Sequence, residues 1–306
     1  MAYVKWEAEH MSNQSGKIAV VTGSNTGTGY HIAHGLAAKG AHVILACRNL
    51  EKATAAKDRI LADIPNAKVA VEHLDLADLQ CVKEFSERMH STYQHLDLLI
   101  NNAGVMIPPK STTKDGFELQ FGTNHLGHFA LTGRLLPLLE AAPKARILTM
   151  ASIAHKSGKI DFDDLHSERK RYVRWASYSQ SKLANLMFAL ELERRLKARK
   201  SSVSSLGCHP GWSSTDLQRH SLVVRFFDLF LGMNAKKGAA PCLYAATEEE
   251  ALTYGYWGVT KRGEMHGWTG RAKMTSRARN EQTAQKLWAV SCELTGVTYF
   301  EDTQTP

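Results

Sequence analysis

The sequence predicts an α/β fold: a single-domain, Rossmann-type, doubly wound parallel sheet with helices on both faces. Short apolar runs alternate along the chain with longer amphipathic segments, which is typical of β-α-β units. Because the apolar runs are continuous, we expect the sheet to be buried on both faces. The predicted strands are Ile18–Thr22, His42–Cys47, Lys68–His73, Leu96–Asn101, Arg146–Ala151 and Val203–His209. The predicted helices are Gly29–Lys39, Leu50–Asp63, Leu79–Gln94, Thr123–Glu140 and Tyr178–Lys200.

One domain accounts for most of the 306 residues. The apolar fraction of 43% and the charged fraction of 22% are ordinary for a globular protein. No internal repeat, low-complexity tract or linker divides the chain. We expect residues 1–16 to form a flexible N-terminal tail, because they lack apolar periodicity, and residues 17–306 to form the domain.

Composition and charge argue against several other classes of protein. The net charge is +8, but no basic stretch is interleaved with aromatic residues, so no nucleic-acid partner is expected. The five cysteines form no C-x-x-C pair and indicate reduced thiols in a cytoplasmic protein. His125 and His128 lack matching carboxylate or cysteine spacing, so no metal site is predicted.

The most strongly apolar run, Leu222–Met233, is too short to span a bilayer and contains Arg225 and Asp228. The N-terminal stretch has no apolar core of a secretory signal. We therefore expect no transmembrane segment. The sequence leaves three roles open for Leu217–Met233, namely a lid over a hydrophobic substrate, a packed helix, or a shallow membrane contact. A homodimer or homotetramer is also left open.

The loop after the first predicted strand contains three glycines in eight residues, at Gly23, Gly27 and Gly29. Glycines between a strand and a helix let the backbone approach a phosphate at the helix N-terminus. The common G-x-G-x-x-G pattern fails, because Ile32 stands at its last position. The loop therefore indicates a pyrophosphate site, and a turn without a ligand is the alternative.

Arg48 follows the second predicted strand, where an NAD-binding site usually carries an acidic residue for the ribose. A guanidinium at this place can instead pair with a 2′-phosphate. The sequence therefore favours NADP(H) over NAD(H).

Tyr178 and Lys182 stand four residues apart at the start of a predicted helix, so they share one face. A nearby ammonium favours a phenolate, and we expect it to lower the pKa of Tyr178 toward neutrality. Such a phenol can act as a general acid or base. The spacing alone is common in helices and is only a weak signal.

Together these residues resemble the short-chain dehydrogenase/reductase family, from about Lys17 to Phe300. Thr28 departs from the family pattern, which usually has Ile there. The resemblance implies the catalytic set Asn124, Ser152, Tyr178 and Lys182. It implies that the cofactor contacts are Gly23, Ser24, Asn25, Thr26, Gly27, Thr28, Gly29, Arg48, Asn49, Asp75, Leu76, Asn102, Ala103, Gly104, Tyr178, Lys182, Pro210, Gly211, Trp212, Ser213 and Thr215.

Within that family the chain looks most like retinol dehydrogenases and protochlorophyllide-reductase-like members. The likeness rests on Arg48-Asn49, on the run Asn124-His-Leu-Gly-His-Phe129, and on the 26 residues that separate Ser152 from Tyr178. The extra residues in that separation, from Lys159 onward, should form a loop beside the active site.

The resemblance implies hydride transfer between NADP(H) and a small hydrophobic alcohol, aldehyde or ketone. In reduction, Tyr178 would donate the proton, Ser152 would hold the carbonyl oxygen, and Asn124 would hold a water that leads to Lys182. The expected substrate contacts are Met106, His155 and Trp212. The alternatives are an NAD-linked alcohol dehydrogenase, a light-driven tetrapyrrole reductase, and a non-catalytic NADP(H)-sensing protein.

Overall fold

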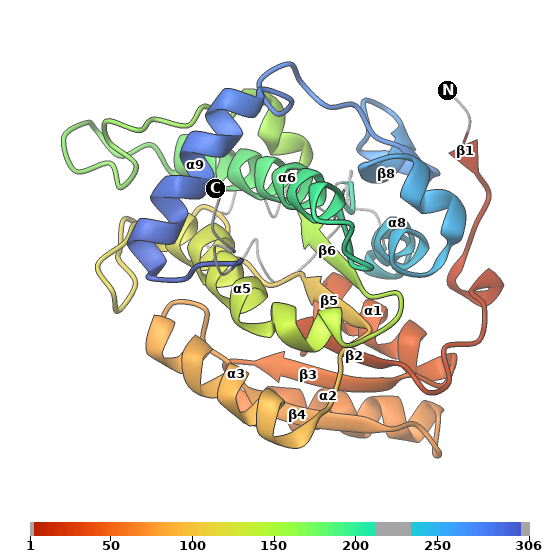
Figure 1. Cartoon of the computed structure of the whole chain (residues 1–306). Coiled ribbons are helices and arrows are strands. Elements are labelled where there is room, and N and C mark those ends of the chain that lie inside the picture. Colours follow the sequence, from red (N-terminus) through yellow and green to blue (C-terminus); the bar gives the residue numbers. More distant parts are fainter. Residues whose placement is uncertain (1–2, 212–233, 301–306) are drawn as a thin grey trace.

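The computed structural model describes residues 3–211 and 234–300. Nine strands of this described part form one sheet in the order β1-β9-β8-β7-β6-β5-β2-β3-β4 (Figure 1). All neighbours from β4 to β8 run parallel, whereas β9 pairs antiparallel with β8 and with β1. The strands are β1 (Tyr3–Val4), β2 (Ile18–Thr22), β3 (His42–Cys47), β4 (Val69–His73), β5 (Leu98–Asn101), β6 (Arg146–Met150), β7 (Ser204–Cys208), β8 (Tyr256–Lys261) and β9 (His266–Arg271).

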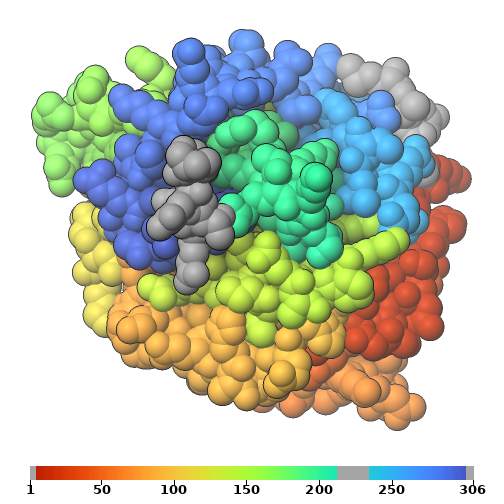
Figure 2. All heavy atoms as spheres, viewed as in Figure 1, coloured from red at the N-terminus to blue at the C-terminus, as the bar shows by residue number. Residues whose placement is uncertain are grey.

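Helices cover both faces of the sheet, with α1, α2 and α8 on one side and α3, α5, α6 and α9 on the other (Figure 1). The space-filling view shows α3, α5 and α6 as successive bands and α9 packed against α6 (Figure 2). The longer helices are α1 (Gly27–Ala38), α2 (Leu50–Asp63), α3 (Leu79–Thr92), α5 (Gly127–Glu140), α6 (Arg174–Ala198), α8 (Ala235–Thr247) and α9 (Glu281–Thr295). The short ones are η1 (Ala8–His10), α4 (Leu119–Phe121), η2 (Gly122–Leu126), η3 (Ile153–Ser157) and η5 (Glu249–Thr253).

Alternation along the central strands explains why both layers form. Successive side chains of a strand point to opposite faces, and in β2 both sets are apolar. Val21 belongs to the core shared with α1, α2 and α8, whereas Val20 belongs to the core shared with α3, α5 and α6. Both side chains are fully buried. The predicted doubly wound fold is therefore confirmed.

The all-parallel sheet is corrected at one edge. The chain after α8 turns back as the β8–β9 hairpin, which adds an antiparallel edge to the parallel sheet. In β9 the side chains do not alternate between buried and exposed, because His266, Gly267 and Trp268 are all partly buried. Sequence inspection therefore did not identify these strands.

The expected flexible tail is also corrected, for residues 3–16. The backbone of β1 pairs with β9, and Trp6 packs edge-on against Tyr244 of α8 at 5.6 Å between ring centroids. Met11 and Gln14 are buried as well. These anchors are isolated in the sequence, and β1 and Trp6 contact residues more than 200 positions away, so local periodicity could not identify them.

The order of the strands places the functional site. The chain runs outward from β2 through β3 to β4, then returns to β5 on the other side of β2 and continues outward to β8. Ligands of open α/β sheets bind at such a reversal, outside the carboxyl ends of the strands. The residues that follow β2, β3, β5 and β6 there line one cleft.

Candidate active site

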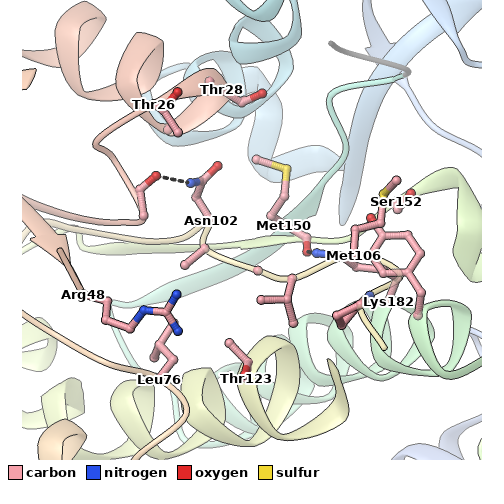
Figure 3. A pocket seen from close by; sticks show the side chains of 18 of the residues that line it. Thr26, Thr28, Arg48, Leu76, Asn102, Met106, Thr123, Met150, Ser152 and Lys182 are labelled. Atoms are coloured by element: carbon pink, nitrogen blue, oxygen red, sulfur yellow. Dashed lines mark hydrogen bonds between the residues drawn. The ribbon is translucent and has the colours of Figure 1, made fainter. Parts of the chain in front are cut away.

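A cleft of about 730 Å³ crosses the carboxyl ends of the parallel strands. Figure 3 shows Arg48 at one end of it and Met106, Ser152 and Lys182 at the other, with Asn102 and Met150 between them. Most of the predicted site residues in the described part line this cleft. They are Gly23, Asn25, Thr26, Gly27, Thr28, Gly29, Arg48, Asn49, Asp75, Leu76, Asn102, Ala103, Gly104, Met106, Ser152, Tyr178, Lys182, Pro210 and Gly211.

The glycine loop joins β2 to α1 at the wall of the cleft. Gly23 and Gly27 have φ values of 63° and 57°, a left-handed conformation that favours glycine. At Gly29 a Cβ atom would lie 2.4 Å from Asn102 Nδ2 and 2.5 Å from the carbonyl oxygen of Gly23. The close contact of loop, helix and Asn102 therefore requires a glycine at position 29.

The N-terminus of α1 fits an anionic group. Its N-cap residue, Thr26, makes no side-chain capping hydrogen bond, whereas the caps of α2 and α3, Asn49 and Asp78, each accept from backbone N–H groups. Uncapped backbone N–H groups and the helix dipole attract phosphate. The residues present therefore fit the pyrophosphate of a dinucleotide.

Thr22, the last residue of β2, fixes this loop relative to β5. Its hydroxyl oxygen accepts hydrogen bonds from the backbone N–H groups of Asn102 and Ala103, both at 2.9 Å. Asn102 Nδ2 donates in return to the Thr22 carbonyl oxygen at 2.8 Å. The two strand ends on either side of the reversal are thus joined by side-chain and backbone bonds, which holds the cleft wall in place.

Two cations stand at the end of the cleft beyond the glycine loop. Arg48 follows β3, and its guanidinium lies beside Leu76 (Figure 3). Lys52, one turn into α2, lines the same end. Both side chains are exposed. Sequence reasoning missed Lys52. Its position three residues after Asn49 could have indicated that it lines the cleft, because the first turn of α2 faces the cleft.

Ser24 differs from the other residues of the glycine loop. Its side chain is fully buried, and its hydroxyl donates to the Val21 carbonyl oxygen at 2.9 Å. The residue is not part of the cleft lining. The Ser24 side chain therefore makes a structural bond within the loop, and a cofactor contact at Ser24 stays a prediction.

Tyr178 and Lys182 project from the first turns of α6 toward the strand end that carries Ser152. The ammonium of Lys182 lies 5.8 Å from the centroid of the Tyr178 ring and donates to the Met150 carbonyl oxygen at 3.0 Å. Ser152 follows β6 and caps η3, with its hydroxyl accepting from the backbone N–H of Ala154. The three side chains thus meet in the cleft, as their sequence spacing predicted for the first two.

Burial is the largest cause of the pKa shifts of Tyr178 and Lys182. Desolvation raises the pKa of Tyr178 to about 12, and a hydrogen bond from Ser152 opposes that rise only partly. Desolvation likewise lowers the pKa of Lys182 to about 8. The expected lowering of the Tyr178 pKa toward neutrality is not found, because the loss of solvent around a phenolate is the largest contribution to the shift. Tyr178 is therefore protonated at neutral pH, which is the form that a general acid requires.

Asn124 lies in η2, a π-helical turn between α4 and α5. Its side chain is fully buried, with Oδ1 accepting from the Val105 N–H at 2.8 Å and Nδ2 donating to the Val105 carbonyl oxygen and to Ser181. A Cβ atom at Gly104 would lie 3.0 Å from Asn124 Oδ1 and 3.6 Å from Lys182 Nζ. Asn124 is therefore near Lys182 but behind the cleft surface.

His155 is corrected from a substrate contact to a buried support. Its side chain is fully buried outside the cleft lining, and its Nδ1 donates to the Ser152 carbonyl oxygen at 2.7 Å. Trp175, which sequence reasoning missed, lines the cleft instead and is 41% exposed. A tryptophan three residues before Tyr178 could have indicated a residue that lines the cleft. Trp212, Ser213, Thr215 and Leu217–Met233 lie outside the described residues.

Comparison with known proteins defines the class. A family model described as short chain dehydrogenase matches residues 17–222, more than half of the chain. The chain therefore belongs to the short-chain dehydrogenase family, as the resemblance in the sequence indicated. It is an oxidoreductase of that family.

The relatives narrow this to retinol-dehydrogenase-like members. Human retinol dehydrogenase 12 is 43% identical over 288 residues, which cover 92% of this chain and 87% of the relative. Human retinol dehydrogenase 13 is 40% identical over 291 residues, with 92% and 85% covered. A solved structure of an uncharacterised protein from Mycobacterium paratuberculosis has a TM-score of 0.83 and 38% identity, covering 97% of this chain and 100% of that one.

The NADP complex of RhlG from Pseudomonas aeruginosa shares the fold at lower identity. Its TM-score is 0.64 and its identity 23%, with 80% of this chain and 94% of that chain covered. In the described part of this chain, no helix is both long enough and apolar enough to cross a membrane.

Proposed function

We propose that this protein is an NADP(H)-dependent oxidoreductase that interconverts a hydrophobic alcohol and its aldehyde or ketone, as a retinol dehydrogenase does. The observation that carries the proposal is the single cleft in which uncapped helix α1 and Arg48 lie at one end and Ser152, Tyr178 and Lys182 at the other. One end suits a phosphorylated dinucleotide, and the other supplies acid–base chemistry.

Arg48 and Lys52 support the choice of NADP(H). Both are exposed cations at the cleft end beyond the glycine loop, where the adenosine ribose of a dinucleotide would lie. A 2′-phosphate there would gain two favourable charges, whereas the carboxylate that usually binds the 2′-hydroxyl of NAD is not at the end of β3.

The proposed mechanism follows from the positions of the side chains. A bound nicotinamide dinucleotide would supply the hydride for reduction or accept it in oxidation. Tyr178, protonated at neutral pH, donates its proton to the carbonyl oxygen as that oxygen gains negative charge. Ser152 donates a second hydrogen bond to the same oxygen. In oxidation the same residues act in reverse, with Tyr178 accepting the proton.

Lys182 and Asn124 have supporting roles in the proposal. The Lys182 ammonium, held on the Met150 carbonyl oxygen, keeps positive charge near the phenol and is placed to contact the nicotinamide ribose. Asn124 fixes the loop at Val105 that forms the cleft wall beside Gly104.

Five free cysteines in the described part support a reducing compartment such as the cytoplasm.

The deciding experiment is an initial-rate assay with NADPH, and in parallel NADH, over apolar aldehydes and ketones that include retinal and compact carbonyls. We expect turnover with NADPH and a preference for large apolar aldehydes. Turnover confined to compact carbonyls would refute the retinoid part, and faster turnover with NADH would refute the cofactor choice. NADPH binding without turnover of any carbonyl would favour the non-catalytic alternative.

A further inference from the structure

Two loops flank the end of the cleft that holds Tyr178. The loop after β5 contributes Met106, Pro108 and Pro109 to the lining. The second loop runs through Tyr172 into the first turn of α6, where Trp175 lines the cleft. All four side chains are largely apolar. The surface beside Tyr178 is therefore suited to the hydrocarbon part of a substrate whose carbonyl lies at Tyr178.

The side chain of Gln120 joins these two loops. Gln120 lies in α4 and is fully buried. Its Oε1 accepts from the Ile107 N–H at 2.9 Å, and its Nε2 donates to the Arg174 carbonyl oxygen at 2.9 Å. The same Nε2 donates to the Tyr172 hydroxyl at 3.0 Å. One amide thus bonds to the backbone of both loops, at residues next to the ones that line the cleft.

Ile107 adopts a conformation that needs such support. Its φ of 55° lies in the left-handed region, which is strained for a β-branched residue. The N–H of this strained residue donates the hydrogen bond to Gln120. The residues on either side of Ile107, Met106 and Pro108, both line the cleft. A strained backbone conformation persists only where surrounding contacts hold it in place. The hydrogen bond from the Ile107 N–H to Gln120 is one such contact.

Tyr172 and Glu118 extend the same connection. The Tyr172 hydroxyl donates to Glu118 Oε1 at 2.9 Å, and the Glu118 carboxylate also accepts from the backbone N–H groups of Gln120 and Phe121. Glu118 is buried. Since each donor and acceptor in this set has a defined partner, the network fixes a single separation of the two loops.

We propose that Gln120 is a positioning residue that sets the width of the apolar end of the cleft, and with it the preference for long apolar carbonyl substrates over compact ones. Gln120 is not part of the cleft lining, so it acts through Ile107 and Arg174. A long chain would pass between the Met106–Pro109 loop and Trp175. The inference rests on the proposed function, because it specifies the substrate of that site.

The test uses Gln120→Met, which keeps the length of the side chain but removes all three hydrogen bonds. Its matched control is Gln180→Met. Gln180 is also buried and bonds the Asp161 N–H and the Leu165 carbonyl oxygen, but these partners do not line the cleft. A merely structural role would lower stability in both variants and leave the substrate preference unchanged.

We expect Gln120→Met to lower the ratio of kcat/KM for retinal to kcat/KM for a compact aldehyde by about tenfold, mainly through KM, because misplacement of a substrate wall penalises the substrate that contacts it. NADPH affinity should not change. Gln180→Met should leave the ratio as in the wild type. An unchanged ratio in folded Gln120→Met, or an equal change in the control, would overturn the inference.

Tyr172→Phe keeps the test decisive if Gln120→Met does not fold, since it removes one hydroxyl from the network and should shift the ratio in the same direction by a smaller factor, about threefold. Calorimetric binding of retinal separates the two proposals. If the wild type turns over no carbonyl, the proposed function fails. Weaker retinal binding in Gln120→Met, with unchanged binding in Gln180→Met, would still support the positioning role, and equal binding would refute it.

Discussion

The two ends of the cleft are held in different ways. At the cofactor end, Gly23 and Gly29 bring the backbone so close to Ala103, Asn102 and the Gly23 carbonyl oxygen that a Cβ atom has no room there. At the substrate end, loops that are far apart in the sequence are joined by the buried side chains of Gln120 and Glu118. The first end therefore tolerates almost no added volume, whereas the second depends on hydrogen-bond partners.

This difference suggests how each end can change without loss of the fold. A backbone cradle serves any ligand with the same pyrophosphate, so it is suited to a cofactor that does not vary. A side-chain connection can be altered by one or two substitutions, which is suited to a substrate that differs among relatives. Tyr178 lines the substrate end together with Ser152 and Lys182.

The largest effect should come from removing the proposed proton donor. Tyr178→Phe removes the proton donor while leaving the buried ring, so kcat should fall by about 10³-fold or more. NADPH affinity, measured by fluorescence titration, should stay within about twofold because the cradle at Gly23–Gly29 is untouched. Turnover close to that of the wild type would contradict the acid–base role.

A smaller effect is expected for Arg48→Ala, which tests the cofactor end alone. Loss of the guanidinium should raise the Kd of NADPH by about tenfold, allowing for its exposure to solvent, and should leave the Kd of NADH unchanged. Lys52→Ala is the matched control and should weaken NADPH binding less, because an ammonium pairs with phosphate as a point charge. Equal weakening for both dinucleotides would contradict a 2′-phosphate contact.

Gly29→Ala sharpens the claim that the cofactor end has no spare volume. The added methyl would meet the Gly23 carbonyl oxygen and Asn102, so we expect a loss of about 1–3 kcal/mol in the free energy of unfolding together with weaker NADPH binding. Gly116→Ala is the control. Its φ of 88° disfavours alanine, but a Cβ there meets nothing within 4 Å, so cofactor binding should not change. Urea unfolding and calorimetric titration measure the two effects.

The smallest effect concerns the histidines behind the cleft. Burial lowers the pKa of His125 and His209 to about 3 and of His128 to about 4, so all three stay neutral in the folded protein. The unfolded chain binds protons near pH 6.5 and the folded one does not. Their contribution to stability is therefore complete above pH 6.5 and declines as pH falls toward those lower values.

The measurement is the urea midpoint at pH 7, 6 and 5, which should fall steadily over that interval. His125→Phe is expected to flatten this slope only in part, because it removes one of several groups that take up a proton on unfolding, and burial also lowers the pKa of His31, His42, His155 and His166. Its ring lies among Phe121, Phe129 and Phe188, which favours the replacement. A midpoint independent of pH between 7 and 5 would contradict the neutral buried histidines.

Local sequence by itself determined the parallel sheet and its two helical layers, because continuous apolar strands and amphipathic helices need only nearest-neighbour patterns to be identified. The glycine loop and the pair Tyr178 and Lys182 were also identified from local sequence. Tyr178 and Lys182 stand four residues apart on one helix, so their spacing carries their relative geometry. The close fit of Gly29 to Asn102, in contrast, joins residues 73 positions apart. Met106 follows the strand end at the reversal and lines the cleft, and its contact with a substrate stays a prediction.

Only the tertiary structure decided the rest. Trp6 packs on Tyr244 of α8, far along the chain, so no local pattern identifies it as core. His155 is a support rather than a contact, because the turn after Ser152 directs its ring inward. The high pKa of Tyr178 follows from burial by many segments together. Gln120 gains its role from Ile107 and Arg174, 13 and 54 residues away, and such distances are set only when the sheet brings the loops together.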